Sequence, residues 1–98
     1  MPPAVPAPDS LAVLFVTPEC TPLVKTGGLG DVSASLPAAL RAAGVDARIL
    51  MPGYPQVMDA LPGATELTRM AALEHGVRLL DAVHPNGVPM VIADCPKL

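Results

Sequence analysis

The sequence predicts an α/β fold built around a strand–helix–strand unit, and three features of its first half support this. Residues 11–16 (LAVLFV) are a short apolar run with β-branched and aromatic members, typical of a strand buried on both faces of a parallel sheet. A loop with a glycine pair follows, and a helical pattern begins at Gly28. A second apolar run, residues 46–51, then predicts a parallel partner strand.

The first strand should cover residues 12–16, after an extended and disordered leader over residues 1–10 that is rich in proline. The helix should run over residues 28–43, and Gly44 should end it. Pro37 lies inside this range, so the helix should kink there or begin later. Apolar residues at helical spacing predict one buried stripe, made of Val32, Leu36, Ala39, Leu40 and Ala43.

The second half of the chain predicts further strands. After the strand at 46–51, Pro52-Gly53-Tyr54-Pro55 predicts a turn, and residues 57–61 fit a single helical turn. Residues 64–73 are ambiguous between strand and helix, and we predict a strand. The apolar runs 76–83 and 88–94 flank His84-Pro85-Asn86-Gly87, and an Asn-Gly pair between such runs is typical of a β-hairpin.

The loop between the first strand and the helix carries the candidate binding residues. Lys25 precedes Gly27 and Gly28, which open the helix. Glycines let the backbone approach a ligand and take positive φ, and a helix N-terminus directs unpaired N–H groups and positive charge at it. With the Lys25 charge beside these donors, the loop predicts a phosphate site. Glu19, just after the strand, and Asp31, in the first helical turn, are each a site residue or a helix cap.

Two common nucleotide-binding loops do not fit these residues. A P-loop needs GxxxxGK[ST], with the lysine after the glycines, whereas Lys25 comes before them. A dinucleotide-binding GxGxxG is absent, because Gly27, Gly28 and Gly30 give GGxG and no acidic residue ends the second apolar run. From these residues alone a structural role stays open, in which the glycines only turn the chain and Lys25 is solvated.

Composition excludes several classes of function. The net charge is −3, the six Lys and Arg residues are scattered, and Phe15 and Tyr54 are the aromatic residues, which argues against nucleic-acid binding. The chain has neither an apolar stretch of about 18 residues nor a signal peptide, so we expect a cytoplasmic protein without membrane contact. The cysteines form no CxxC pair and the histidines lack metal-ligand spacing. We therefore expect no metal site, two reduced thiols (Cys20 and Cys95), and surface or loop roles for His75 and His84.

The order of residues around the glycines resembles that of a known family. The pattern is E-x-x-P-L-x-K-T-G-G-L-x-D-V over residues 19–32, followed by L-P-x-A-L, G-V-D-A-R and P-G-Y-P. It resembles the N-terminal signature of bacterial glycogen synthases and plant starch synthases, the family-five glycosyltransferases. The later VPMVIADCPKL is similar to the family's third-strand region, so the resemblance covers most of the chain after residue 10.

This resemblance implies a fold and a reaction. Residues 11–98 would be the incomplete N-terminal Rossmann-like part of a two-domain (GT-B type) glycosyltransferase, with the β-hairpin as an insertion. The family transfers glucose from ADP-glucose to the non-reducing end of an α-1,4-glucan, with retention and without a metal or other cofactor. Lys25 matches the lysine that binds the sugar nucleotide, and Gly27 and Gly28 match the loop beside its phosphates. Asp31 matches the motif aspartate, whereas Gly30, often alanine in the family, could loosen the helix start.

The length of the chain limits what it can do alone. Family members run to several hundred residues, so the resemblance implies that these 98 residues lack the rest of the first domain and the C-terminal half. No catalytic residue is assigned within them, and we expect the chain alone to be inactive. Its composition, 51% hydrophobic and 15% charged, suits an interior piece of a larger protein. The alternative is a complete chain that acts as a stand-alone sugar-phosphate-binding module or is an inert remnant.

Overall fold

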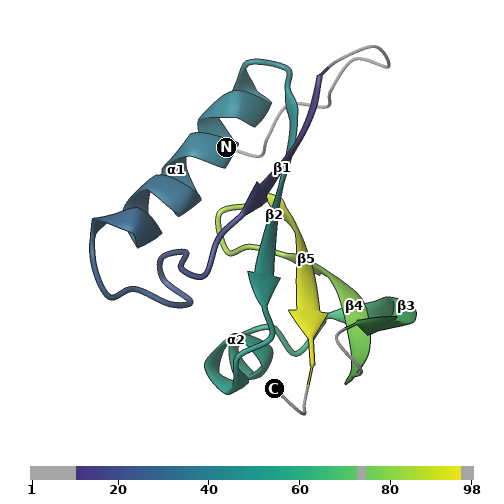
Figure 1. The fold of residues 1–98 in the computed structure, drawn as a ribbon. Coiled ribbons are helices and arrows are strands. Elements are labelled where there is room, and N and C mark those ends of the chain that lie inside the picture. The colour runs from purple at the N-terminus through teal and green to yellow at the C-terminus, as the bar shows by residue number, and fades with distance from the viewer. Residues whose placement is uncertain (1–10, 73–74, 96–98) are drawn as a thin grey trace.

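The computed structural model describes residues 11–72 and 75–95, which fold into a five-stranded sheet with two helices (Figure 1). The leader expected over residues 1–10 lies outside the described residues. The elements in chain order are β1 (Ala12–Val16), α1 (Gly28–Ala42), β2 (Asp46–Pro52), α2 (Pro55–Ala60), β3 (Thr65–Ala72), β4 (His75–Val83) and β5 (Pro89–Asp94).

The sheet has the order β1-β2-β5-β4-β3 and combines parallel and antiparallel pairs. β1 pairs in parallel with β2, from Ala12 opposite Asp46 to Val16 opposite Leu50, and β2 pairs in parallel with β5. The predicted strand–helix–strand unit with adjacent parallel strands is therefore confirmed. β4 runs antiparallel to β5, and β3 runs antiparallel to β4. The strand predicted over residues 64–73 is β3, and the helical turn predicted at 57–61 is α2, which begins two residues earlier.

The core lies on one face of the sheet. The pairing places Ile49, Met90 and Ala82 in one row across β2, β5 and β4, and all three are buried. Val57 of α2 and Leu23 of the loop after β1 belong to the same buried cluster. The two helices and this loop therefore cover the same face, with α1 alongside β1 and β2 in Figure 1.

The face that α1 turns to the sheet differs from the prediction. Of the predicted apolar stripe, only Leu40 is half-buried, whereas the other four members are exposed, Val32 to 49% and Leu36 to 42%. The buried positions are Gly30, Ser33, Pro37 and Arg41. Small residues let the helix approach the sheet closely, and Ser33 and Arg41 bond to the chain beneath them. The expected stripe was wrong because the side that packs on the sheet consists of small residues, with Ala34 and Ala38 against the core, and of the polar anchors Ser33 and Arg41, rather than of the large apolar residues.

Both ends of α1 follow local sequence signals. The helix begins at Gly28, as predicted, and continues through Pro37, so the alternative of a later start is wrong. It ends one residue before the expected boundary. There Gly44 has φ of +91°, and the amides of Gly44 and Val45 donate to the carbonyls of Arg41 and Leu40. This is the Schellman arrangement, which satisfies the last carbonyls of a helix.

The second face of the sheet carries no helix within the part of the chain that the structure describes. β1 was expected to be buried on both faces, but Leu14 and Val16 are exposed to 53% and 68%. These two side chains point away from α1, and β1 is also the edge strand. The expectation failed because burial on both faces needs a second layer, which these residues do not supply.

None of the helices that the structure describes is both long and apolar enough to cross a membrane.

We predict that Gly44→Ala destabilises the protein by about 1 kcal/mol, because an L side chain is disfavoured at the left-handed conformation of this position. Urea unfolding followed by circular dichroism measures the change. Gly63→Ala is the matched control, since a Cβ at Gly63 meets no atom within 4 Å and its φ is not positive. An equal loss in both variants would contradict the prediction.

Candidate functional site

The carboxyl ends of three parallel strands meet at one edge of the sheet, where open α/β sheets bind their ligands. β1 leads there into the loop of residues 17–27, β2 into Gly53 and Tyr54, and β5 into Cys95. The predicted site residues all belong to the first of these segments or to the start of α1. Their position at this edge is a consequence of the strand order.

Hydrogen bonds fix the beginning of the loop on α1. The hydroxyls of Thr17 and Ser33, both buried, lie 2.9 Å apart. Thr17 Oγ1 also donates to the Glu19 carbonyl at 2.7 Å and accepts from the Glu19 amide at 3.2 Å. The backbone at Glu19 is therefore held from two sides, directly after the strand.

The middle of the loop is a tight turn that packs on Gly30. The amides of Leu23 and Val24 donate to the Cys20 carbonyl, and the Thr21 amide donates to the Gly30 carbonyl at 3.0 Å. A Cβ on Gly30 would lie 3.0 Å from Thr21 Oγ1 and 3.2 Å from the Val24 carbonyl oxygen. There is therefore a steric reason for glycine at position 30: without a side chain there, the helix and the loop can make contact.

Lys25, near the end of the loop, and Asp31, in the first turn of α1, form an ion pair. Lys25 Nζ lies 2.9 Å from Asp31 Oδ2, and Thr21 Oγ1 donates to Asp31 Oδ1 at 2.9 Å. These bonds, from Lys25 first and Thr21 second, hold the pKa of Asp31 below its ordinary value, so the carboxylate is ionised at neutral pH. Both charged side chains are about half exposed, at 51% and 56%, which leaves Lys25 accessible from solvent.

Glu19 contacts the backbone just before the helix. Its Oε1 accepts from the Thr26 amide at 2.9 Å. Hydrogen bonds from Thr26, with a smaller contribution from the Gly27 amide, lower the pKa of Glu19. Glu19 thus acts as an acceptor for the N–H groups that precede α1, and its carboxylate occupies part of the space in which an anion would meet them.

The glycine pair differs from the expectation in one respect. Gly27 has φ of −169°, which is extended backbone, and Gly28 is the first residue of α1, so neither takes the expected positive φ. A Cβ at either residue would meet no atom of the protein within 4 Å. The backbone conformation therefore does not require glycine here. What the two glycines provide is open space over the backbone beside Lys25.

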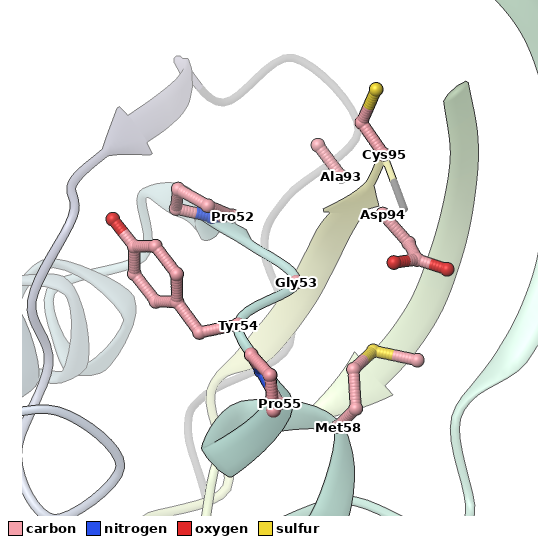
Figure 2. A pocket seen from close by; sticks show the side chains of 8 residues that line it. All are labelled: Pro52, Gly53, Tyr54, Pro55, Met58, Ala93, Asp94 and Cys95. Carbon is pink, nitrogen blue, oxygen red and sulfur yellow. The ribbon is translucent and has the colours of Figure 1, made fainter. Parts of the chain in front are cut away.

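A hollow of about 470 Å³ lies at the same edge of the sheet, after β2 and β5 (Figure 2). Tyr54 and Asp94 are among the residues that line it. Asp94 is buried, and its Oδ2 accepts from Arg78 Nη2 at 2.7 Å and from Arg78 Nε at 3.2 Å. A Cβ on Gly53 would lie 3.1 Å from Asp94 Cα, so glycine lets the two backbones come close. Asp94 was not among the predicted site residues, although its place at the end of an apolar run was a usable signal.

His84 was expected to have a surface or loop role. Its side chain is buried, so the expected surface position is wrong. It lies in the loop between β4 and β5, where its Nε2 is 2.8 Å from the Thr21 carbonyl oxygen and its Nδ1 accepts from the Asn86 amide at 3.1 Å. From the same loop, Asn86 Nδ2 donates to the Ala34 carbonyl of α1 at 2.9 Å. This loop therefore contacts both the candidate site and the helix beside it.

The cysteines are unpaired, as predicted. Cys20 is buried under the loop, and desolvation raises the pKa of its thiol to about 11. Within residues 11–72 and 75–95, the structure brings together no group of three or more side chains of the types that bind metals.

The site therefore offers an exposed ammonium group beside open glycine backbone at a helix N-terminus, which suits phosphate. Comparison with known sequences decides the family, because a sequence profile described as "Starch synthase catalytic domain" matches residues 12–98. The chain belongs to the starch synthase catalytic domain family.

Curated relatives of this starch synthase family chain are named glycogen synthase. The glycogen synthase of Aromatoleum aromaticum is 54% identical over 91 residues, which is 90% of this chain and 18% of the relative. That of Dechloromonas aromatica is 49% identical over 93 residues, which is 92% of this chain and 19% of the relative. The chain thus spans about a fifth of the length of these relatives.

A solved structure shares the fold. The catalytic domain of starch synthase IV from Arabidopsis thaliana, bound to ADP and acarbose, matches with a TM-score of 0.74 at 24% identity. The match covers 90% of this chain and 19% of that chain. The mixed α/β fold with its five-stranded sheet is therefore similar to part of a starch synthase catalytic domain.

We predict that iodoacetamide at pH 8 labels Cys95 well before Cys20 in the folded protein, as read by peptide mass spectrometry. With a pKa of about 11, roughly a thousandth of Cys20 is thiolate at that pH, and the residue is fully buried, whereas Cys95 is partly exposed. The rate at Cys20 should rise only as the pH approaches about 11. In urea both cysteines should react alike; rapid labelling of folded Cys20 would contradict the burial.

Proposed function

We propose that this chain is the N-terminal part of a glycogen synthase that transfers glucose from ADP-glucose to the non-reducing end of an α-1,4-glucan, with retention. The observation that carries the proposal is Lys25 beside the open backbone of Gly27 and Gly28, at the sheet edge where ligands bind. In the proposed enzyme this chain belongs to a Rossmann-like N-terminal domain of the GT-B type, with the β-hairpin predicted over residues 76–94, which corresponds to β4 and β5, as an insertion.

Lys25 and the glycine backbone are proposed to hold the diphosphate of the donor. Negative charge builds up on the departing diphosphate as the glucosyl bond breaks, so a lysine and a helix N-terminus at this place stabilise the transition state more than the ground state. The ion pair with Asp31 does not prevent this, because exposed ion pairs are weak and a diphosphate carries more charge than one carboxylate. Asp31 then orients Lys25 rather than occupying the donor site.

Glu19 is proposed to set the shape of the same loop. Its carboxylate holds the Thr26 amide, so the backbone before Gly27 is ordered before a ligand arrives. Because the Glu19 carboxylate lies where an anion would approach, it also limits how deeply a phosphate enters, which favours binding over the glycines.

The proposed enzyme needs a second half. The relatives are about five times longer than this chain, and family resemblance assigns most nucleotide contacts and the catalytic residues to the part that this chain does not contain. The exposed apolar residues of α1 and β1 favour this over a stand-alone sugar-phosphate-binding module, because such surfaces are ordinarily covered. ADP-glucose as the donor is proposed from the family resemblance alone, and the cytoplasmic location is likewise a proposal.

We predict that Lys25→Ala weakens ADP-glucose binding by the full-length protein about tenfold or more, since a charged hydrogen bond to the diphosphate is lost. Calorimetry gives the dissociation constant, and a coupled assay of ADP release gives turnover, which should fall as well. Lys25→Arg should recover part of the loss. Arg69→Ala, which removes an exposed cation on the distant strand β3, is the control. Unchanged affinity and turnover in Lys25→Ala would refute the role of Lys25.

We also predict that residues 1–98 alone do not elongate glycogen from ADP-glucose, because one wall of a two-domain cleft lacks the groups that bind the base and stabilise the sugar cation. Incorporation of labelled glucose into glycogen measures this, with the full-length protein as the positive control. Measurable elongation by residues 1–98 would contradict the two-domain proposal.

A further inference from the structure

We propose that His84 is a positioning residue for Lys25: from the loop between β4 and β5 it holds the backbone of the donor-binding loop in place. The inference rests on the proposed function for its consequence, donor affinity, but its structural part stands on contacts of the chain itself. His84 and Thr21 are 63 positions apart in the sequence, and His84 Nε2 lies 2.8 Å from the Thr21 carbonyl oxygen.

The hydrogen-bond partners of the imidazole favour one tautomer. An amide N–H can only donate, so Nδ1, which faces the Asn86 amide at 3.1 Å, carries no proton. A carbonyl oxygen can only accept, so Nε2 carries the proton and donates it to Thr21. Both ring nitrogens of His84 thus have a partner, in a buried position where an unmet polar group would be costly.

Thr21 connects His84 to Lys25 through hydrogen bonds. Its carbonyl is held by His84, its amide donates to the Gly30 carbonyl of α1, and its hydroxyl donates to Asp31 Oδ1. The other oxygen of Asp31 accepts from Lys25 Nζ. A continuous series of hydrogen bonds therefore runs from buried His84 to exposed Lys25, and each bond is 3.0 Å or shorter.

The loop is bonded to α1 and within itself, but the contacts that residues 20–24 receive from other described parts of the chain are less directional. Leu23 and Cys20 are buried under it, but apolar contacts do not fix the direction of a peptide group. Gln56 Nε2 reaches the Leu23 carbonyl only at 3.4 Å. His84 supplies the short, directional bond from the antiparallel part of the sheet, and Asn86 keeps its loop against α1 through the Ala34 carbonyl.

His84 makes two hydrogen bonds, one to the Thr21 carbonyl and one from the Asn86 amide within the turn between β4 and β5. Two variants distinguish their effects. His84→Asn keeps an acceptor near the Nδ1 position for the Asn86 amide but is too short to reach Thr21. His84→Gln places an amide N–H near the Nε2 position for Thr21 but loses the acceptor for Asn86. Amide hydrogen exchange over residues 20–24, read by mass spectrometry on the full-length protein, reports the order of the loop without any ligand.

We expect His84→Asn to speed exchange over residues 20–24 and to raise the dissociation constant for ADP-glucose, each about tenfold, with His84→Gln close to the unmodified protein in both. Unchanged loop exchange in His84→Asn would overturn the proposal. So would equal or larger effects in His84→Gln, which would assign His84 to the turn. If exchange changes as expected but the unmodified protein binds no ADP-glucose, the positioning role stands and the proposed function fails.

A measurement on the unmodified protein keeps the proposal testable if a variant does not fold. The nitrogen-15 chemical shifts of the His84 ring distinguish a protonated from an unprotonated ring nitrogen. A proton on Nε2 with a bare Nδ1 supports the bond to Thr21. A proton on Nδ1 would overturn it, because Nε2 would then have no proton to donate to the Thr21 carbonyl.

Discussion

The close packing of α1 against the loop of residues 17–27 is the constraint on which the site depends. Gly30 has no side chain where the loop touches the helix, and Ser33 places its hydroxyl against Thr17 at the start of the loop. A larger residue at either position would separate α1 from the loop and displace the loop residues that contact it. The glycine pair is therefore presented at the sheet edge by close packing in the first two turns of α1.

Charge at the site is balanced before any ligand is present. Lys25 faces Asp31, and Glu19 faces the amide of Thr26, so each positive element has a carboxylate within hydrogen-bond distance. Such pairs order the loop at low cost because both remain open to water. A more highly charged anion can then compete for the same cation and amides, and little reorganisation of the backbone is required.

Large apolar side chains are exposed on two surfaces of the described chain. Leu29, Val32 and Leu36 form a row on the outer side of α1, and Leu14 and Val16 lie on the uncovered face of β1. A helix of this kind normally turns its apolar side inward, and here polar anchors hold the opposite side against the sheet. Both surfaces agree with a chain that spans about a fifth of its relatives.

The sequence by itself determined the strands, the ends of α1 to within one residue and the family resemblance of the loop, because apolar runs, Gly44 and the order of Lys25 and the glycines are local signals. Only the tertiary structure decided which side of α1 is buried, since that depends on what lies beneath Ser33 and not on hydrophobicity. It also decided the place of His84, whose pattern in the sequence says nothing of a carbonyl 63 positions away. Contacts between segments distant in the chain follow from strand order and close packing, which no local pattern encodes.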